Sequence, residues 1–328
     1  MSKYKEVLEH VVGMMEKDPE LSIAGATKLA CVECDMPYKD TVRRSVSNLL
    51  AKQVADTVAE SSELFQDAKQ RETEDKQTFL ISWAQNATPI HKNFMKNLKA
   101  YANDLDAGLH IVAGRYSNPT SVFADKDQDW WSPEVVPYLD AARHNIHKYM
   151  QILSDVKIPP TASTPLSGLN SITGLESCIV GHPRQQVKSL PIFDGYPCKL
   201  LMSTGACTVA NYTDSKSGKK GEFHHSIGFT IVELDGENFH VRQVSADEKG
   251  NFYDLFKRVK NGKVLENVEG CEAAILGDIH IAHNDEKATA VSFKLLDEMK
   301  PNHTMLHDIV DCESISHHEE QDPFRVMQ

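Results

Sequence analysis

Gly277-Asp278-Ile279-His280 and His307-Asp308-Ile309-Val310-Asp311 are the two segments of this chain that decide its expected fold. Each follows a short apolar run, Ala-Ala-Ile-Leu at 273–276 and Thr-Met-Leu at 304–306. Short apolar runs of this kind are typical of buried parallel strands. Between them, residues 285–300 carry apolar side chains at helical spacing. The sequence therefore predicts a strand, a helix and a second parallel strand.

Polar side chains end both predicted strands. Because the carboxyl ends of neighbouring parallel strands meet at one edge of a sheet, we expect Asp278, His280 and Asp308 to lie close together. Carboxylate oxygen and imidazole nitrogen are ligands for Mn²⁺, Zn²⁺ and Fe. The sequence predicts a metal site here. The alternative is that these are ordinary loop and capping residues.

The two segments resemble the opening motifs of the calcineurin-like metallophosphoesterases, Asp-x-His and Gly-Asp-x-x-Asp. Asp278 and His280 match the first motif, and Asp308 and Asp311 match the second, with His307 in place of its glycine. The resemblance covers roughly residues 270–322. It implies a site for two divalent ions, most simply Mn²⁺, with Zn²⁺, Fe or Mg²⁺ as alternatives.

The same resemblance assigns roles to these residues. It implies that Asp278 and His280 hold the first ion and that Asp308 bridges both ions. His307 and Asp311 are expected to act in catalysis, Asp311 by orienting a ligand.

The family's two remaining motifs, Gly-Asn-His-Asp/Glu and Gly-His-x-His, do not follow Asp311 in this sequence. Asn302-His303 has part of the third motif but precedes the second strand. We therefore expect either the N-terminal portion of a longer enzyme or a degenerate member with an incomplete site. His317 and His318 are candidate metal ligands that would help to complete the site, with a solvated loop as the alternative.

Length and composition indicate a soluble protein of two or three domains, with 328 residues and a net charge of -12. No apolar run approaches the roughly 18 residues of a membrane span, and no signal peptide is visible. With seven cysteines that lack framework spacing, we expect a cytoplasmic location, the host cytoplasm if the gene is from a phage. The acidic balance excludes a generally basic nucleic-acid binder. Cys31 and Cys34 have CxxC spacing, and two thiols on a helix are expected.

Residues 1–53 predict a helical, helix-turn-helix-like module of three short helices, over 4–15, 22–30 and 39–50. Arg43 and Arg44 on the third helix are candidate nucleic-acid contacts. Lysine plus arginine balances aspartate plus glutamate in this module, so an interaction or oligomerisation role is the alternative. Residues 54–77 are expected to be a linker.

Residues 78–155 predict an α/β unit and residues 156–270 a β-rich region. In the first, strands are expected at 79–84 and 109–113, with a helix between them that starts at Thr88-Pro89. Gln85-Asn86-Ala87-Thr88 is either a structural cap or an anion site. In the second, strands are expected at 199–204, 227–233 and 239–244. Residues 271–328 complete the expected organisation as the start of the metal-site segment.

Lys216, Lys219 and Lys220 form a compact basic patch in this acidic chain. They are candidate phosphate contacts, with a solvated hairpin tip as the alternative.

The overall order of segments resembles phosphoesterase-type proteins of large tailed bacteriophages, including nucleases that degrade host DNA early in infection. It implies a mixed α/β, metal-dependent DNA nuclease, without membrane association, that forms a homo-oligomer. The alternative is a DNA-binding regulatory or interaction protein with an inactive phosphoesterase fold.

Overall fold

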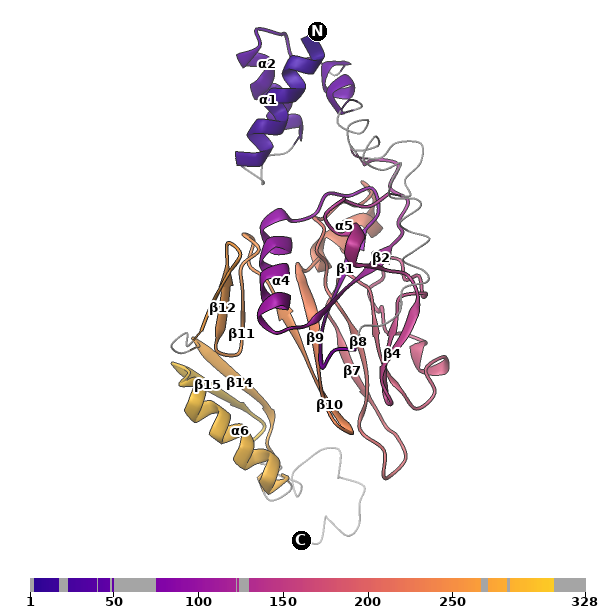
Figure 1. Cartoon of the computed structure of the whole chain (residues 1–328), viewed down its shortest axis with the longest axis vertical. Coiled ribbons are helices and arrows are strands. Elements are labelled where there is room, and N and C mark those ends of the chain that lie inside the picture. The colour runs from indigo at the N-terminus through magenta and orange to yellow at the C-terminus, as the bar shows by residue number, and fades with distance from the viewer. Residues whose placement is uncertain are drawn as a thin grey trace. The chain divides into compact units, whose positions relative to one another are not determined.

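The computed structural model of the chain describes residues 3–17, 23–39, 41–47, 49, 75–121, 123, 130–266, 271–281 and 284–309. The chain divides into two compact units, Met1–Phe252 with Val259–Val264, and Tyr253–Arg258 with Leu265–Gln328 (Figure 1). Helices and strands alternate through both units, so the predicted mixed α/β class is confirmed. Within the described part of the chain, no helix has the length and apolarity that crossing a bilayer requires.

The N-terminal region is helical, as predicted. Helix α1 spans Lys3–Lys17, helix α2 spans Ile23–Glu33, and residues 41–47 are also helical. Their inward faces share one small core, which consists of Val7, Leu8, Val11, Ala26, Ala30, Cys31, Val42 and Val46. Cys31 and Cys34 are free thiols, and Cys34 Sγ lies 3.6 Å from His10 Nδ1. Asn48, Leu50 and residues 54–74 of the expected linker lie outside the described residues.

A five-stranded mixed sheet, here the first sheet, organises the middle of the chain. Its order is β10-β9-β1-β2-β3, with β1 parallel to β2, β2 parallel to β3, and β9 antiparallel to both β1 and β10. The strands are β1 (Thr78–Gln85), β2 (Gly108–Gly114), β3 (Leu139–Asp140), β9 (Gly228–Asp235) and β10 (Asn238–Ser245). Helix α4 (Lys92–Asp104) connects β1 to β2, so the predicted strand-helix-strand unit is confirmed.

A second five-stranded sheet, the second sheet, has the order β4-β5-β6-β8-β7. Its strands are β4 (Arg143–His147), β5 (Met150–Leu153), β6 (Ser177–Val180), β7 (Val187–Leu190) and β8 (Lys199–Ser203). Short helices accompany the two sheets: η1 (Val136–Tyr138), η2 (Leu169–Ser171) and α5 (Lys216–His224). A small three-stranded sheet follows, formed by β11 (Phe252–Asp254), β12 (Lys257–Lys260) and β13 (Lys263–Leu265).

Strand β1 lies at the centre of three layers because successive side chains of a strand point to opposite faces. Leu80 and Ala84 join the core beneath α4, whereas Phe79, Ile81 and Trp83 join the core shared with the second sheet. Helix α4, the first sheet and the second sheet are thus stacked in that order. Figure 1 shows α4 beside β1 and β9.

One local prediction and one open alternative for this region are wrong. Helix α4 does not begin at Thr88-Pro89, because His91 is its N-cap and accepts a hydrogen bond from the Phe94 amide. Residues 216–221 are not a hairpin tip but the first part of helix α5, which Ser215 caps. The predicted hairpin of β9 and β10 is confirmed, with Gly236 in its turn at φ 58°. Strand β9 pairs with β1. The predicted α/β unit at 78–155 and the predicted β-rich region at 156–270 therefore contribute strands to the same sheet.

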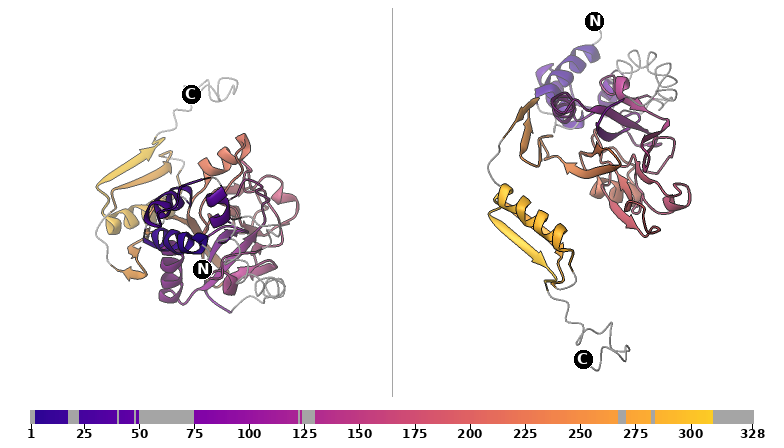
Figure 2. Two further views of the ribbon diagram at one scale, coloured as in Figure 1. Left: turned by 90° about the horizontal axis from the view of Figure 1, so that it is seen from above. Right: turned by 60° about the horizontal axis from the view of Figure 1, so that its bottom comes forward.

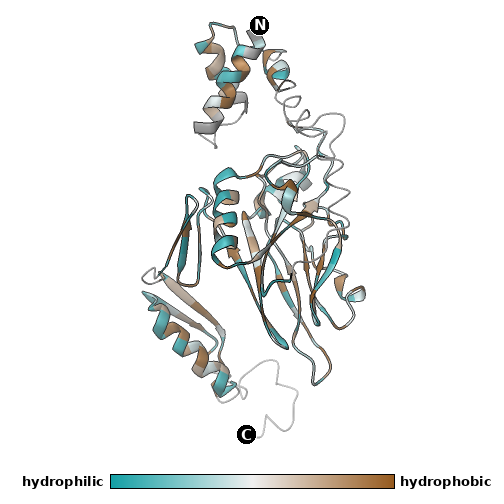
Figure 3. Cartoon of the chain, in the orientation of Figure 1, coloured by the Kyte–Doolittle hydropathy of each residue, from teal (hydrophilic) through white to brown (hydrophobic). Residues whose placement is uncertain are grey.

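The second unit contains β14 (Ala273–Asp278), α6 (Glu286–Met299) and β15 (His303–His307). The strands are parallel, which confirms the strand-helix-strand prediction. Figure 2 shows α6 lying along this pair of strands. The expectation that both strands are buried is wrong for the described residues, because Ile275 is 72% exposed and Met305 57% exposed. Two strands and one helix bury too little surface, and Figure 3 shows that α6 presents both polar and apolar residues.

Candidate metal centre

A register shift brings together the polar ends of β14 and β15. Leu276 pairs with Leu306, but the next pair is Asp278 with His307, so Gly277 is the extra residue of a bulge. Beyond the bulge, the backbone amides of Ile279 and His280 both donate hydrogen bonds to the Asp308 carbonyl oxygen, each at 3.1 Å. The segments that follow β14 and β15 are therefore hydrogen-bonded to each other immediately after the two strands end.

Three of the predicted ligands meet at this edge. One ligand atom from each of Asp278, His280 and Asp308 lies within 4.8 Å of the other two. Two carboxylates and one imidazole are a donor set that suits Mn²⁺, Zn²⁺ or Fe. The sequence-based expectation that these residues converge agrees with this geometry.

The backbone at two of these residues is in a costly conformation. His280 has φ 46° and Asp308 has φ 37°, in the left-handed region that side chains with a β-carbon seldom adopt. Strained backbone of this kind is concentrated at functional sites, where the surrounding structure maintains it. Six other non-glycine residues of the described chain share this conformation, so it agrees with a site at His280 and Asp308 without identifying one.

His307 contacts the acidic residues of this group. Its Nδ1 donates a hydrogen bond to Asp278 Oδ1 at 2.6 Å and lies 3.7 Å from Asp308 Oδ2. The hydrogen bond to Asp278, followed by the charges of Asp308 and Asp278, raises the pKa of His307 above its ordinary value. His307 is thus placed to orient the carboxylate of Asp278.

A pocket of about 480 Å³ opens beside the cluster. Its walls are the end of β14 and the first turns of α6, including Asp278, His280, Asn284, Asp285, Thr289 and Ser292. Asp285 caps α6 by accepting a hydrogen bond from the Ala288 amide at 2.9 Å. The pocket is lined by carboxylates, so it would repel a phosphate group unless a cation offset their charge.

The remaining candidate residues lie elsewhere. Asp311, His317 and His318 are outside the described residues. Lys216, Lys219 and Lys220 are exposed on α5, where Lys219 forms an ion pair with Glu222 at 2.8 Å. Arg43 and Arg44 are in the third N-terminal helix. These basic residues and the acidic cluster belong to different units of the chain.

The segment Gln85-Asn86-Ala87-Thr88 is occupied by contacts within the protein. Asn86 Oδ1 accepts a hydrogen bond from the Tyr116 amide at 2.7 Å, and Thr88 Oγ1 donates to the Asn86 carbonyl at 2.9 Å. Asn211 Nδ2 donates to Thr88 Oγ1 at 3.0 Å. These contacts support the structural alternative rather than an anion site.

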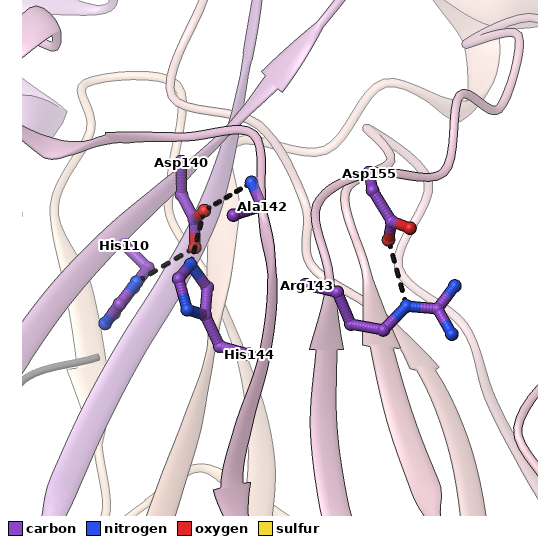
Figure 4. A network of polar contacts seen from close by, with 6 residues as sticks. All are labelled: His110, Asp140, Ala142, Arg143, His144 and Asp155. Atoms are coloured by element: carbon purple, nitrogen blue, oxygen red, sulfur yellow. Dashed lines mark hydrogen bonds and ion pairs between the residues drawn. The ribbon is translucent and has the colours of Figure 1, made fainter. Parts of the chain in front are cut away.

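A second group of possible ligands, His110, Asp140 and His144, is not evident from the sequence. These residues come from β2, β3 and β4, and all three are buried (Figure 4). Asp140 accepts hydrogen bonds from His110 Nδ1 at 3.1 Å, His144 Nε2 at 2.8 Å and the Ala142 amide at 3.0 Å. The only available signal was a histidine and an aspartate within otherwise apolar strands.

Direct hydrogen bonds explain this second group without an ion. Burial by itself raises the pKa of Asp140, but the hydrogen bonds and charges of His110 and His144 outweigh it and lower the pKa to about 2. His110 Nδ1 and His144 Nε2 both lie at hydrogen-bond distance from the Asp140 carboxylate. The group therefore links the first sheet to β4 of the second sheet.

Comparison with known proteins finds a relative by sequence. The chain is 28% identical over 328 residues to Protein A1 of Escherichia phage T5, an alignment that covers 95% of this chain. The chain spans 58% of the length of that relative. No protein-family model matches.

Two solved structures of Vacuolar Protein Sorting 29 resemble the chain weakly. The protein from Chaetomium thermophilum has 11% identity and a TM-score of 0.30, covering 54% of this chain and 94% of its own. The protein from Cryptosporidium parvum has 12% identity and a TM-score of 0.25, covering 53% and 100%. Likenesses of this size do not establish a shared fold.

Proposed function

We propose that the protein hydrolyses phosphodiester bonds with divalent metal ions, and that DNA is its substrate. The observation that carries this proposal is the convergence of Asp278, His280 and Asp308 at the ends of two parallel strands, beside a pocket. A mixed set of oxygen and nitrogen ligands favours Mn²⁺, with Zn²⁺, Fe or Mg²⁺ as alternatives.

The residues of the site have distinct tasks. Asp278 and His280 would hold the first ion, and Asp308 would be shared with a second. Bound divalent ions supply charge stabilisation at the attacked phosphate and activate water. His307 holds one oxygen of Asp278 in place, which leaves the other oxygen available to a ligand.

DNA as substrate is supported by helix α5. Lys216, Lys219 and Lys220 are exposed on α5, and the neighbouring Phe223 is 84% exposed. Lysines beside an exposed aromatic ring are the combination that binds single-stranded nucleic acid, through phosphates and stacked bases. Metal ions and this helix would provide local positive charge in a protein of net charge -12.

Metal-dependent hydrolysis of bis-p-nitrophenyl phosphate, and of single- and double-stranded DNA, tests the proposal. We expect turnover with Mn²⁺ and none after exhaustive treatment with EDTA, with recovery when Mn²⁺ is restored. Turnover that survives chelation would contradict the proposal.

A second candidate is a DNA-binding interaction protein without turnover. It is favoured by the number of candidate ligands. Among the described residues, the group whose ligand atoms lie within 4.8 Å of one another has three members, Asp278, His280 and Asp308, fewer than two filled coordination shells need. This alternative predicts DNA binding that persists in EDTA and no hydrolysis with any of the four metals.

A further inference from the structure

Lys199, the first residue of β8, is a cationic side chain that the fold buries. Only 5% of this residue is exposed. Its ammonium group donates a hydrogen bond to the carbonyl oxygen of Gly174 at 2.5 Å. Buried lysines are rare and are normally paired with an anion, because removing a charge from water is costly.

No such anion is present among the described residues, where Lys199 forms no ion pair. A titratable group influenced by its charge is Cys178, on the adjacent strand β6. Burial raises the pKa of Cys178 to about 12, and the charges of Lys199 and Arg143 offset this only in part. The thiol is therefore neutral near pH 7 and does not balance the charge of Lys199.

Lys199 is part of the lining of a pocket of about 480 Å³ between η2 and the end of β7. Most of the other lining side chains are apolar, namely Leu175, Leu190, Pro191, Ile192 and Phe193. Phe193 is 73% exposed and Leu175 is 40% exposed, so apolar surface is accessible from solvent beside the cation.

We propose that this pocket binds a small carboxylic acid with an apolar body. The carboxylate would pair with Lys199, and the apolar part would cover Phe193 and Leu175. The volume is in the range of pockets that hold small molecules. A carboxylate fits better than a phosphate, because a phosphate has more charge and is usually bound by several donors.

The pocket is formed by the second sheet and lies in a different unit from Asp278 and Asp308. The inference does not rest on the proposed hydrolysis, because neither Asp278 nor Asp308 lines this pocket.

Calorimetric titration of the full chain with 4-phenylbutyrate tests the proposal, with 4-phenylbutyramide as the uncharged ligand of nearly the same shape. We expect saturable binding of the acid, and binding of the amide that is weaker by roughly tenfold or more, as the loss of a charge-assisted hydrogen bond implies. Equal affinity for the two ligands, or no saturable binding of the acid, would overturn the proposal.

Lys199→Met retains the length of the side chain and removes its charge. We expect it to lower affinity for 4-phenylbutyrate to that of the amide, without lowering thermal stability, because a buried charge is removed. Lys188→Met is the control, since Lys188 is exposed on β7. If Lys199→Met does not fold, the comparison of 4-phenylbutyrate with 4-phenylbutyramide on the unaltered protein still tests the proposal.

A peptide that ends in leucine, with a free or an amidated C-terminus, separates two sources of the carboxylate. We expect the free peptide to bind more weakly than 4-phenylbutyrate, because the pocket is of small-molecule size. Tighter binding of the free peptide would overturn the assignment to a small acid and replace it with a chain terminus.

Discussion

Asp278 and His307 face each other across the paired ends of β14 and β15, with Asp278 Oδ1 2.6 Å from His307 Nδ1. The bulge at Gly277 creates this register, because without it Asp278 would not lie opposite His307. The imidazole constrains the carboxylate through one oxygen. A residue that orients a metal ligand in this way affects metal affinity without touching the ion.

His307→Ala should therefore weaken Mn²⁺ binding by roughly 10- to 100-fold, the usual effect of removing a partner of a metal ligand. Calorimetric titration with Mn²⁺ measures this. His303→Ala is the matched control, because His303 begins the same strand and lies 3.9 Å from Glu272, outside the cluster. Equal Mn²⁺ affinity in His307→Ala and the unaltered protein would exclude the positioning role.

Asp308→Asn should reduce Mn²⁺-dependent hydrolysis of bis-p-nitrophenyl phosphate by more than roughly 100-fold, since even the outer partners of metal ligands contribute that much. The change preserves side-chain shape and removes the charge expected to be shared by two ions. Thermal stability in EDTA should hardly change, because the Asp308 side chain is 64% exposed. An active Asp308→Asn with an inactive His303→Ala would show that the second motif is wrongly aligned.

The strand-helix-strand unit and the convergence of Asp278, His280 and Asp308 could be predicted because their signals are local. Apolar runs at 273–276 and 304–306 and the helical spacing between them fix which residues end the strands. The burial of those strands could not be predicted in the same way, because an apolar run does not show what covers it.

The errors elsewhere arise from contacts between distant segments. The sequence of residues 216–221 also fits a solvated hairpin tip, the alternative that the structure excludes. In the structure, Gly218 and Gly221 lie on the packed face of α5, where β-carbons would meet Thr213 and Tyr212. His110, Asp140 and His144 meet only because β3 pairs with β2 and the chain then enters the second sheet at β4.

Asp140 should make the middle of the chain sensitive to acid. Its folded pKa of about 2 is below its ordinary value of 3.8, so its contribution to stability is complete above pH 4 and is lost as the pH falls through 2. The shift corresponds to about 2 kcal/mol. Asp140→Asn should lower the free energy of unfolding at pH 7, and its difference from the unaltered protein should shrink between pH 4 and pH 2.

Tryptophan fluorescence during urea unfolding reports this region selectively, because all three tryptophans, Trp83, Trp130 and Trp131, lie in the middle of the chain. A difference that is constant from pH 7 to pH 2 would show that Asp140 does not titrate with the expected pKa.

Gly114→Ala should destabilise the same region. A β-carbon at Gly114 would overlap the indole of Trp83, which is 2% exposed between the two sheets. Overpacking of this kind typically costs about 1–3 kcal/mol. Gly236→Asn is the control, because its turn has φ 58°, which asparagine tolerates, and open space around it. Equal urea midpoints for the two variants would contradict this account of the packing.

Helix α5 should bind single-stranded DNA through two separable contributions. Both variants are made in the Asp308→Asn protein and measured in EDTA, so that cleavage is prevented. Lys220→Ala should reduce the slope of log affinity against log salt concentration by about 0.7, the value for one phosphate contact with a single strand. Phe223→Ala should lower affinity by roughly fivefold or more, the loss of one stacked base, and leave the salt slope unchanged.

Fluorescence anisotropy with a labelled oligonucleotide at several salt concentrations measures both effects. Lys188→Ala, on the exposed strand β7, is the matched lysine control and should change neither quantity. If Phe223→Ala binds as the parent does while Lys220→Ala and Lys188→Ala weaken binding equally, the interaction is diffuse attraction by surface charge, and α5 is not the DNA-binding surface.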